Sequence, residues 1–167
     1  MQKKFFGTLC VLLLLSCTVQ AAVPEETAAF HVKYQLQKML VLSRYNIRSP
    51  LGSSIVNLTP HTWFAWTSAP GELSQKGGEL ETLMGQYFRQ RLVRDGLMAE
   101  HEQPQEGEMR FYANSLQRTI ATAQYFSSGM LPVANVRIEH HEAVGQMDPV
   151  FTAKFTFMND MYYAEAM

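Results

Sequence analysis

The strongest constraint on the fold is a long amphipathic segment in the middle of the chain, residues 74–96. Ser74 can cap the start of a helix there, and Gly96 is well placed to end it. Apolar side chains recur between them at helical spacing, as Leu80, Leu83, Met84, Tyr87, Phe88 and Leu92. Solvent should cover the opposite face, which carries Glu81, Arg89, Arg91 and Arg94. The segment therefore predicts one long helix that packs its apolar stripe against the rest of a domain.

Strand-like runs lie on both sides of this helix. Residues 39–43 are mostly apolar and lead into a turn that contains Pro50, a pattern typical of a buried strand. Residues 109–113 are rich in aromatic side chains and predict a second strand, which a helix ending at Gly129 follows. Residues 134–139 alternate between apolar and polar side chains and predict a third, half-exposed strand. The succession β-α-β-α-β is typical of an α/β domain with a doubly wound, mainly parallel sheet.

The first residues have the three parts of a secretory signal. A basic start precedes an apolar run over residues 5–15, and Val19-Gln20-Ala21 offers a cleavage site of small residues. The apolar run is too short to cross a membrane comfortably. We therefore expect a signal peptide over residues 1–21 and an exported domain over residues 22–167 that makes no membrane contact. The alternative is a lipoprotein, in which Cys17 would be lipidated and become the N-terminus.

The composition is that of an ordinary globular protein and narrows the possible partners. The chain of 167 residues is 47% hydrophobic and 17% charged, with a formal net charge of −1. It has no basic tract, so binding to nucleic acid is not expected. The adjacent His140 and His141 would point to opposite faces of a strand, and no carboxylate or cysteine spacing completes a site around them. We expect neither a metal nor another cofactor.

Two arginines follow directly on the first predicted strand. Arg44 and Arg48 would emerge at its carboxyl end, where open α/β sheets keep ligand sites, and guanidinium groups can hold a phosphate by paired hydrogen bonds. Arg118 lies in the first turn of the second predicted helix, which Asn114 or Ser115 could cap, beside unpaired N–H groups that attract anions. The alternative is that all three are solvated surface residues.

A long loop after these arginines carries Trp63, Phe64 and Trp66. The three aromatic side chains could form a wall for the organic part of a substrate. They could equally form a small satellite core at the edge of the sheet.

Four blocks of the chain carry a resemblance to a known family. Residues 44–50 resemble the Arg-His-Gly-x-Arg-x-Pro signature of the histidine acid phosphatases. They resemble the periplasmic glucose-1-phosphatase branch more closely, because that branch has Asn, like Asn46, where most members have Gly. Residues 73–78, 113–119 and 147–149 continue the resemblance in the family's order. The chain thus resembles the N-terminal part of a histidine acid phosphatase.

The resemblance implies a fold, an activity and a set of site residues. It implies the first part of a doubly wound, histidine-phosphatase-like sheet, and hydrolysis of phosphate monoesters, such as sugar or inositol phosphates, through a phosphohistidine in the periplasm. It implies that Arg44, Arg48 and Arg118 bind the phosphate. The expected ligand is therefore a phosphomonoester or inorganic phosphate, and no feature of the sequence indicates an oligomeric state.

Two departures from the family pattern bear on catalysis. Tyr45 occupies the position of the nucleophilic histidine, and a phenol with a pKa of about 10 is almost wholly protonated at acid pH. The family's second catalytic block, a His-Asp pair, does not occur in the 167 residues, so residues 22–167 are expected to be an incomplete domain. The apolar residues 155–163 should pack on other segments, and the resemblance implies that these are encoded beyond Met167.

Three hypotheses remain open on these grounds. The chain is a family member that has lost catalysis, as a remnant or as the first part of an interrupted gene. Alternatively, it is a module that binds phosphoesters without turnover, or a small active phosphatase with an unusual nucleophile.

Overall fold

The structure is a computed structural model, and it describes residues 27–52, 58, 60–62, 65–101 and 103–152. The chain divides into two compact units, residues 1–35 and residues 36–167. The described part of the first unit contains helix α1 (Ala28–Lys33), where the Thr27 hydroxyl accepts a hydrogen bond from the backbone N–H of Phe30. The predicted signal segment with Cys17, Trp63, Phe64 and the apolar residues 155–163 lie outside the described residues.

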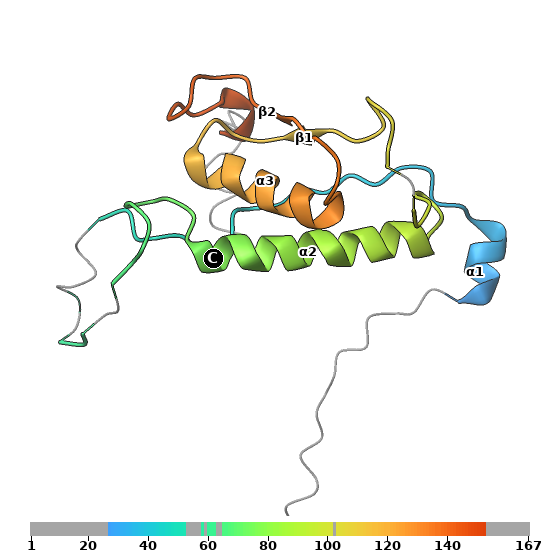
Figure 1. The fold of residues 1–167 in the computed structure, drawn as a ribbon, viewed down its shortest axis with the longest axis horizontal. Coiled ribbons are helices and arrows are strands. Elements are labelled where there is room, and N and C mark those ends of the chain that lie inside the picture. The colour runs from blue at the N-terminus through green and yellow to red at the C-terminus, as the bar shows by residue number, and fades with distance from the viewer. Residues whose placement is uncertain (1–26, 53–57, 59, 63–64, 102, 153–167) are drawn as a thin grey trace, which may run out of the picture. The chain divides into compact units, whose positions relative to one another are not determined.

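The second unit is built around two helices, α2 (Gln75–Arg94) and α3 (Gln117–Met130). Figure 1 shows α3 lying along α2, with strands β1 and β2 on the other side of α3. The predicted cap of α2 is present, because the Ser74 hydroxyl accepts a hydrogen bond from the N–H of Gly77 at 3.1 Å. Gly96 follows the end of α2 with a φ of 78°, a conformation that glycine adopts readily.

The buried face of α2 differs from the predicted one. Its buried residues are Gly77, Gly78, Glu81, Gly85 and Leu92. Leu83 and Tyr87, predicted to lie in the core, are 58% and 55% exposed. The prediction that Glu81 lies on a solvated face is wrong as well, since only 5% of this residue is exposed.

The physical reason is a very close approach of α2 and α3. A Cβ atom on Gly85 would lie 2.1 Å from the carbonyl oxygen of Phe126, and one on Gly129 would lie 2.0 Å from the carbonyl oxygen of Thr82. Only glycine leaves room for such contacts between backbones. The glycine face of α2 therefore packs on α3, and the larger apolar side chains are displaced to the sides. Gly129, predicted to end α3, lies inside it.

The described sheet has two parallel strands, β1 (Phe111–Tyr112) and β2 (Ile138–Glu139). Phe111 pairs with Ile138 and Tyr112 with Glu139. Helix α3 connects the two strands, as expected for a parallel pair. These elements follow the order of the second half of the predicted succession, and the α/β class is confirmed. Of the residues predicted as the third strand, however, only 138–139 form one.

The strand predicted over residues 39–43 is wrong. Residues 34–46 have no helix or strand, and Leu40 and Leu42 are 83% and 88% exposed. A strand needs a neighbouring strand to bond its N–H and C=O groups, and no described segment pairs with residues 39–43. Extended pairing begins only at Arg48, in a single antiparallel bridge with Leu73.

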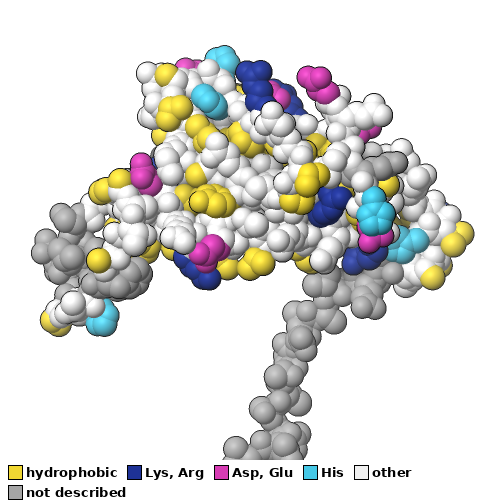
Figure 2. Space-filling model, viewed as in Figure 1, with side chains coloured by type: hydrophobic (Ala, Val, Ile, Leu, Met, Phe, Trp, Pro, Cys, Tyr) yellow, Lys and Arg dark blue, Asp and Glu magenta, His cyan; other side chains and the backbone are white. Residues whose placement is uncertain are grey.

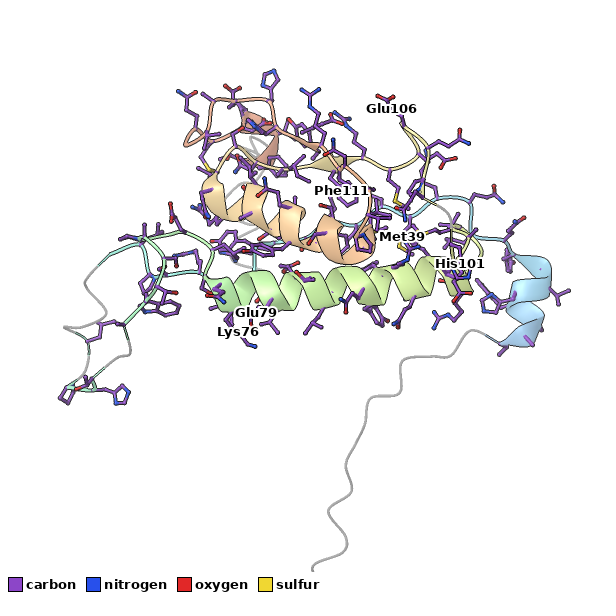
Figure 3. The ribbon with its side chains drawn as sticks, in the orientation of Figure 1. Met39, Lys76, Glu79, His101, Glu106 and Phe111 are labelled. Atoms are coloured by element: carbon purple, nitrogen blue, oxygen red, sulfur yellow. The ribbon has the colours of Figure 1, made fainter. Side chains whose placement is uncertain are left out.

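The core of the second unit lies at the carboxyl ends of α2 and α3. Leu92, Met130 and Leu131 are buried there, and Phe126 contacts Phe88 and Phe111, with ring centroids 5.5 and 6.3 Å apart. Met39 and Phe111, labelled in Figure 3, also pack against this core. Lys76 and Glu79, labelled at the start of α2, form an exposed ion pair at 3.1 Å. None of the described helices is long and apolar enough to cross a membrane.

Candidate functional site

The segment that carries the first two predicted site arginines is held against the start of α2. The N–H and the hydroxyl of Ser74 both donate to the carbonyl oxygen of Ile47, at 3.0 and 2.9 Å. The N–H of Ser49 donates to the carbonyl oxygen of Glu72 at 3.0 Å. Residues 47–49 therefore form a strap on the N-terminal end of α2, and this strap sets where Arg44 and Arg48 lie.

Gly77 and Glu81 complete the attachment of this strap. A Cβ atom on Gly77 would lie 2.3 Å from the carbonyl oxygen of Ile47, so a larger residue there would push the strap away. The side-chain NH2 of Asn46 donates to the Glu81 carboxylate at 2.9 Å. The side-chain oxygen of Asn46 accepts from the N–H of Ile47, also at 2.9 Å. Buried carboxylates need such partners. Glu81 thus positions the residue next to Tyr45.

Sequence reasoning missed Glu81 as a site residue. The helical periodicity of residues 74–96 predicts that Glu81 lies on the charged face of the helix, and such a face is usually solvated. The available signal was its spacing, since Glu81 lies four residues after Gly77 and four before Gly85. A carboxylate between glycines on one helix face indicates a face that another segment approaches closely.

Three guanidinium groups surround the ring of Tyr45. Their central carbons lie 5.2 Å (Arg44), 5.5 Å (Arg48) and 4.9 Å (Arg118) from the ring centroid, within the range of cation–π contacts. Two of them also bond its hydroxyl oxygen, which accepts from Nη2 of Arg44 at 3.3 Å and from Nε of Arg48 at 3.2 Å. We call these four side chains the arginine cluster. The structure thus brings together all four predicted site residues, whose role in phosphate binding stays a prediction.

Arg118 enters the cluster from the first turn of α3. Neither Asn114 nor Ser115 caps this helix as predicted, because the N-cap is Leu116, whose side chain makes no capping bond. The side-chain oxygen of Gln117 instead accepts from the N–H of Leu73 at 3.0 Å, which ties the start of α3 to the residue before the α2 cap. The Nε of Arg118 is buried and has no hydrogen-bond partner in the described part of the chain.

The arginines change the acidity of the phenol they surround. The hydrogen bond from Arg44, and next the one from Arg48, lower the pKa of Tyr45 to about 8, because cationic donors stabilise the phenolate. The same interaction raises the pKa of Arg44. No carboxylate of the described residues forms an ion pair with Arg44, Arg48 or Arg118. The described residues also contain no group of side chains that could hold a metal ion.

Asn114, Ser115 and Asp148 form a second hydrogen-bonded group, beyond the end of β1. The Asn114 side chain accepts from the N–H of Asp148 at 2.9 Å, and the Ser115 hydroxyl accepts from the N–H of Glu142 at 3.0 Å. Asp148, 1% exposed, accepts from the Tyr112 hydroxyl at 2.5 Å, and this bond chiefly lowers the pKa of Asp148. Asp148 also caps the 3-10 helix η2 (Pro149–Phe151). This group fastens residues 140–151 to the start of α3.

Comparisons with known proteins show which family the chain resembles. The family model described as histidine phosphatase superfamily (branch 2) matches residues 2–161. The chain is 44% identical over 147 residues to a glucose-1-phosphatase of Salmonella typhimurium, covering 86% of this chain and 34% of that one. It is 31% identical over 141 residues to phytase AppA of Escherichia coli, covering 83% of this chain and 32% of that one.

Solved structures of phytases are also similar to the chain. A Hafnia alvei phytase in complex with myo-inositol hexakis sulphate superposes with a TM-score of 0.63 and 32% sequence identity, covering 70% of this chain and 29% of the phytase. The same phytase in complex with tartrate gives a TM-score of 0.60. The chain spans about a third of the length of the curated relatives that it matches.

Proposed function

The chain belongs to branch 2 of the histidine phosphatase superfamily, and from that membership we propose that its arginine cluster binds the phosphate of a monoester without hydrolysing it through a phosphohistidine. One observation carries the proposal. Arg44, Arg48 and Arg118 converge on Tyr45, which stands where the resemblance implies the nucleophilic histidine. Three guanidinium groups without carboxylate partners in the described residues are suited to a phosphate dianion.

The loss of phosphohistidine chemistry follows from the side chain at position 45. A neutral imidazole offers a nucleophilic nitrogen near neutral pH, whereas a phenol must first lose its proton. Even with a pKa of about 8, Tyr45 is almost wholly protonated at acid pH. An ester formed on a phenol also hydrolyses far more slowly than a phosphoramidate. We therefore propose a family member that retains anion binding and has lost multiple turnover.

The names of the relatives suggest the class of ligand. They are a glucose-1-phosphatase and a phytase, and a solved phytase holds a hexasulphated inositol. We extend this to a phosphorylated sugar or polyol as the ligand of the present chain.

Phosphate binding by the arginine cluster can be tested by calorimetry with inorganic phosphate. Arg48→Ala should weaken binding at least about tenfold, because a charge-assisted hydrogen bond contributes about 1.5 to 3 kcal/mol. Arg137→Ala is the matched control, since it removes one exposed arginine outside the cluster and should leave the affinity unchanged. Equal binding by the wild type and Arg48→Ala would refute the proposal.

The loss of turnover has a test of its own. The wild-type chain should not hydrolyse a chromogenic aryl phosphate through multiple turnovers between about pH 3 and 7.

We also propose that the chain is exported to the periplasm after cleavage at Ala21. The support is the order of basic, apolar and small residues over positions 1–21. N-terminal sequencing of the protein from a periplasmic extract should begin at Ala22. A lipidated Cys17 as the first residue would instead establish the lipoprotein alternative.

A further inference from the structure

The hydroxyl oxygen of Tyr45 is the point on which the arginine cluster converges. Nη2 of Arg44 and Nε of Arg48 both donate to this one oxygen, and the Arg118 guanidinium lies against the ring. By resemblance, Tyr45 stands at the position of the family's nucleophilic histidine, so this oxygen is the candidate attacking atom. Tyr45 is partly exposed, so a ligand can reach it.

We propose that Tyr45 is a phosphoryl acceptor that takes one phosphoryl group from an aryl or acyl phosphate and keeps it as phosphotyrosine. This inference rests on the proposed function, because the donor must first bind to the arginine cluster. It differs from the phosphohistidine cycle because the phosphoryl group is transferred once and then stays on the protein.

The arginines prepare the nucleophile. The two hydrogen bonds from cationic donors stabilise a negative charge on the phenolic oxygen, and they lower the pKa of Tyr45 to about 8. A substantial fraction of Tyr45 is therefore phenolate at mildly alkaline pH, whereas an ordinary tyrosine remains protonated there.

The same arginines stabilise the product. A phosphotyrosine carries a charge of about −1.5 to −2 and three acceptor oxygens. Arg44 and Arg48 already donate to the oxygen that would carry the phosphoryl group, and the buried Nε of Arg118 has no partner in the described residues. All three cations can therefore pair with the new dianion.

The transfer of the phosphoryl group needs no reactant other than the donor and Tyr45. The Tyr45 oxygen forms a bond to phosphorus, the bond from phosphorus to the leaving oxygen of the donor breaks, and that oxygen keeps the electron pair. The phenolic proton passes to solvent. The hydrogen-bond partners of the Tyr45 hydroxyl in the described residues are arginines, which do not supply protons at these pH values. The leaving group must therefore be a weak base, such as a nitrophenolate or a carboxylate, rather than a sugar alkoxide.

The reaction should stop after this step. Release of phosphate would require a base that activates water beside the phosphotyrosine, and the guanidinium groups that bond the hydroxyl cannot act as bases. Each chain should consequently react once.

The test uses the full chain with 4-nitrophenyl phosphate and, separately, acetyl phosphate. We expect a burst of at most one nitrophenolate per chain, an intact mass raised by one phosphoryl group, and that group on the peptide containing Tyr45. The rate should rise about tenfold per pH unit below 8 and become level above it, as for a nucleophile that ionises near that pH. Tyr45→Phe should give no burst and no label, whereas Tyr87→Phe, which removes an exposed tyrosine of α2, should be labelled like the wild type.

The outcomes separate this inference from the proposed function. A wild-type chain that binds inorganic phosphate but acquires no label on Tyr45 at pH 9 would overturn the transfer and leave phosphate binding intact. A label on another residue, or an equal label in Tyr45→Phe, would also overturn it, as would nitrophenolate release far beyond one per chain. Loss of both phosphate binding and labelling in the wild type would refute both proposals.

Discussion

At the scale of single residues, Tyr45 occupies an unusual environment for a tyrosine. Most phenols of a folded protein keep a pKa near 10, but three guanidinium groups lie within 5.5 Å of this ring centroid. The hydrogen bonds from Arg44 and Arg48 favour the phenolate and lower its pKa to about 8. Tyr112 shows the opposite case, since its bond to the Asp148 carboxylate raises its pKa. The neighbouring charge decides the direction of each shift.

The lowered pKa predicts a pH dependence of stability. The native state releases the Tyr45 proton near pH 8 and the unfolded state near pH 10, so the free energy of unfolding should rise between these values. This gain is complete above pH 10 and is lost as the pH falls through 8. Urea unfolding of the wild type and Tyr45→Phe measures the difference, and Tyr87→Phe serves as the control. Parallel pH profiles for the wild type and Tyr45→Phe would contradict the assignment.

At the scale of elements, the contact between α2 and α3 depends on glycines rather than on an apolar stripe. Gly78 faces the Tyr125 ring, while Gly85 and Gly129 each meet a backbone carbonyl of the other helix. The two helices can approach closely only because these positions lack a Cβ atom. This close contact also brings Arg118, in the first turn of α3, next to the strap on α2 that carries Arg48.

Gly85→Ala should therefore destabilise the chain, although alanine is the better helix former. Helix propensity would contribute about 1 kcal/mol in favour of alanine. The new Cβ atom would lie 2.1 Å from the Phe126 carbonyl oxygen, and relieving such a clash with backbone costs typically about 1 to 3 kcal/mol and sometimes more. We expect a lower urea midpoint and weaker phosphate binding. Gly52→Ala is the control, because nothing lies within 4 Å of its Cβ position. A stabilised Gly85→Ala would show that the helices can separate at little cost.

At the scale of the whole molecule, large apolar side chains remain in contact with solvent. Leu40, Leu42 and Val133 are 83%, 88% and 79% exposed, and Figure 2 shows apolar side chains among the surface atoms of the described residues. The described sheet has only two strands, and the curated relatives are about three times as long as the matched region. Apolar surface of this kind favours association with other protein surfaces.

We expect the isolated chain to bind a hydrophobic dye and to self-associate as its concentration rises. Leu40→Ser combined with Leu42→Ser should reduce both effects, because these side chains are exposed and contribute little to the core. Light scattering and dye fluorescence measure the change, with the exposed neighbour Gln37→Ser as the control. If the double variant associates as strongly as the wild type, these leucines do not drive association.

The features that the sequence alone determined are local, or are carried by motifs. Helix α2 with its Ser74 cap, helix α3 and the order of the last two strands follow from periodicity and capping, which depend on residues a few positions apart. The family, too, could be recognised from short motifs in order. The tertiary structure decided what depends on distant partners. It placed the glycine face of α2 against α3 and buried Glu81 beside Asn46, and among the described residues it gave 39–43 no strand partner. It also brought Arg118 to Tyr45, because an arginine far along the chain reaches this phenol only through the packing of two helices.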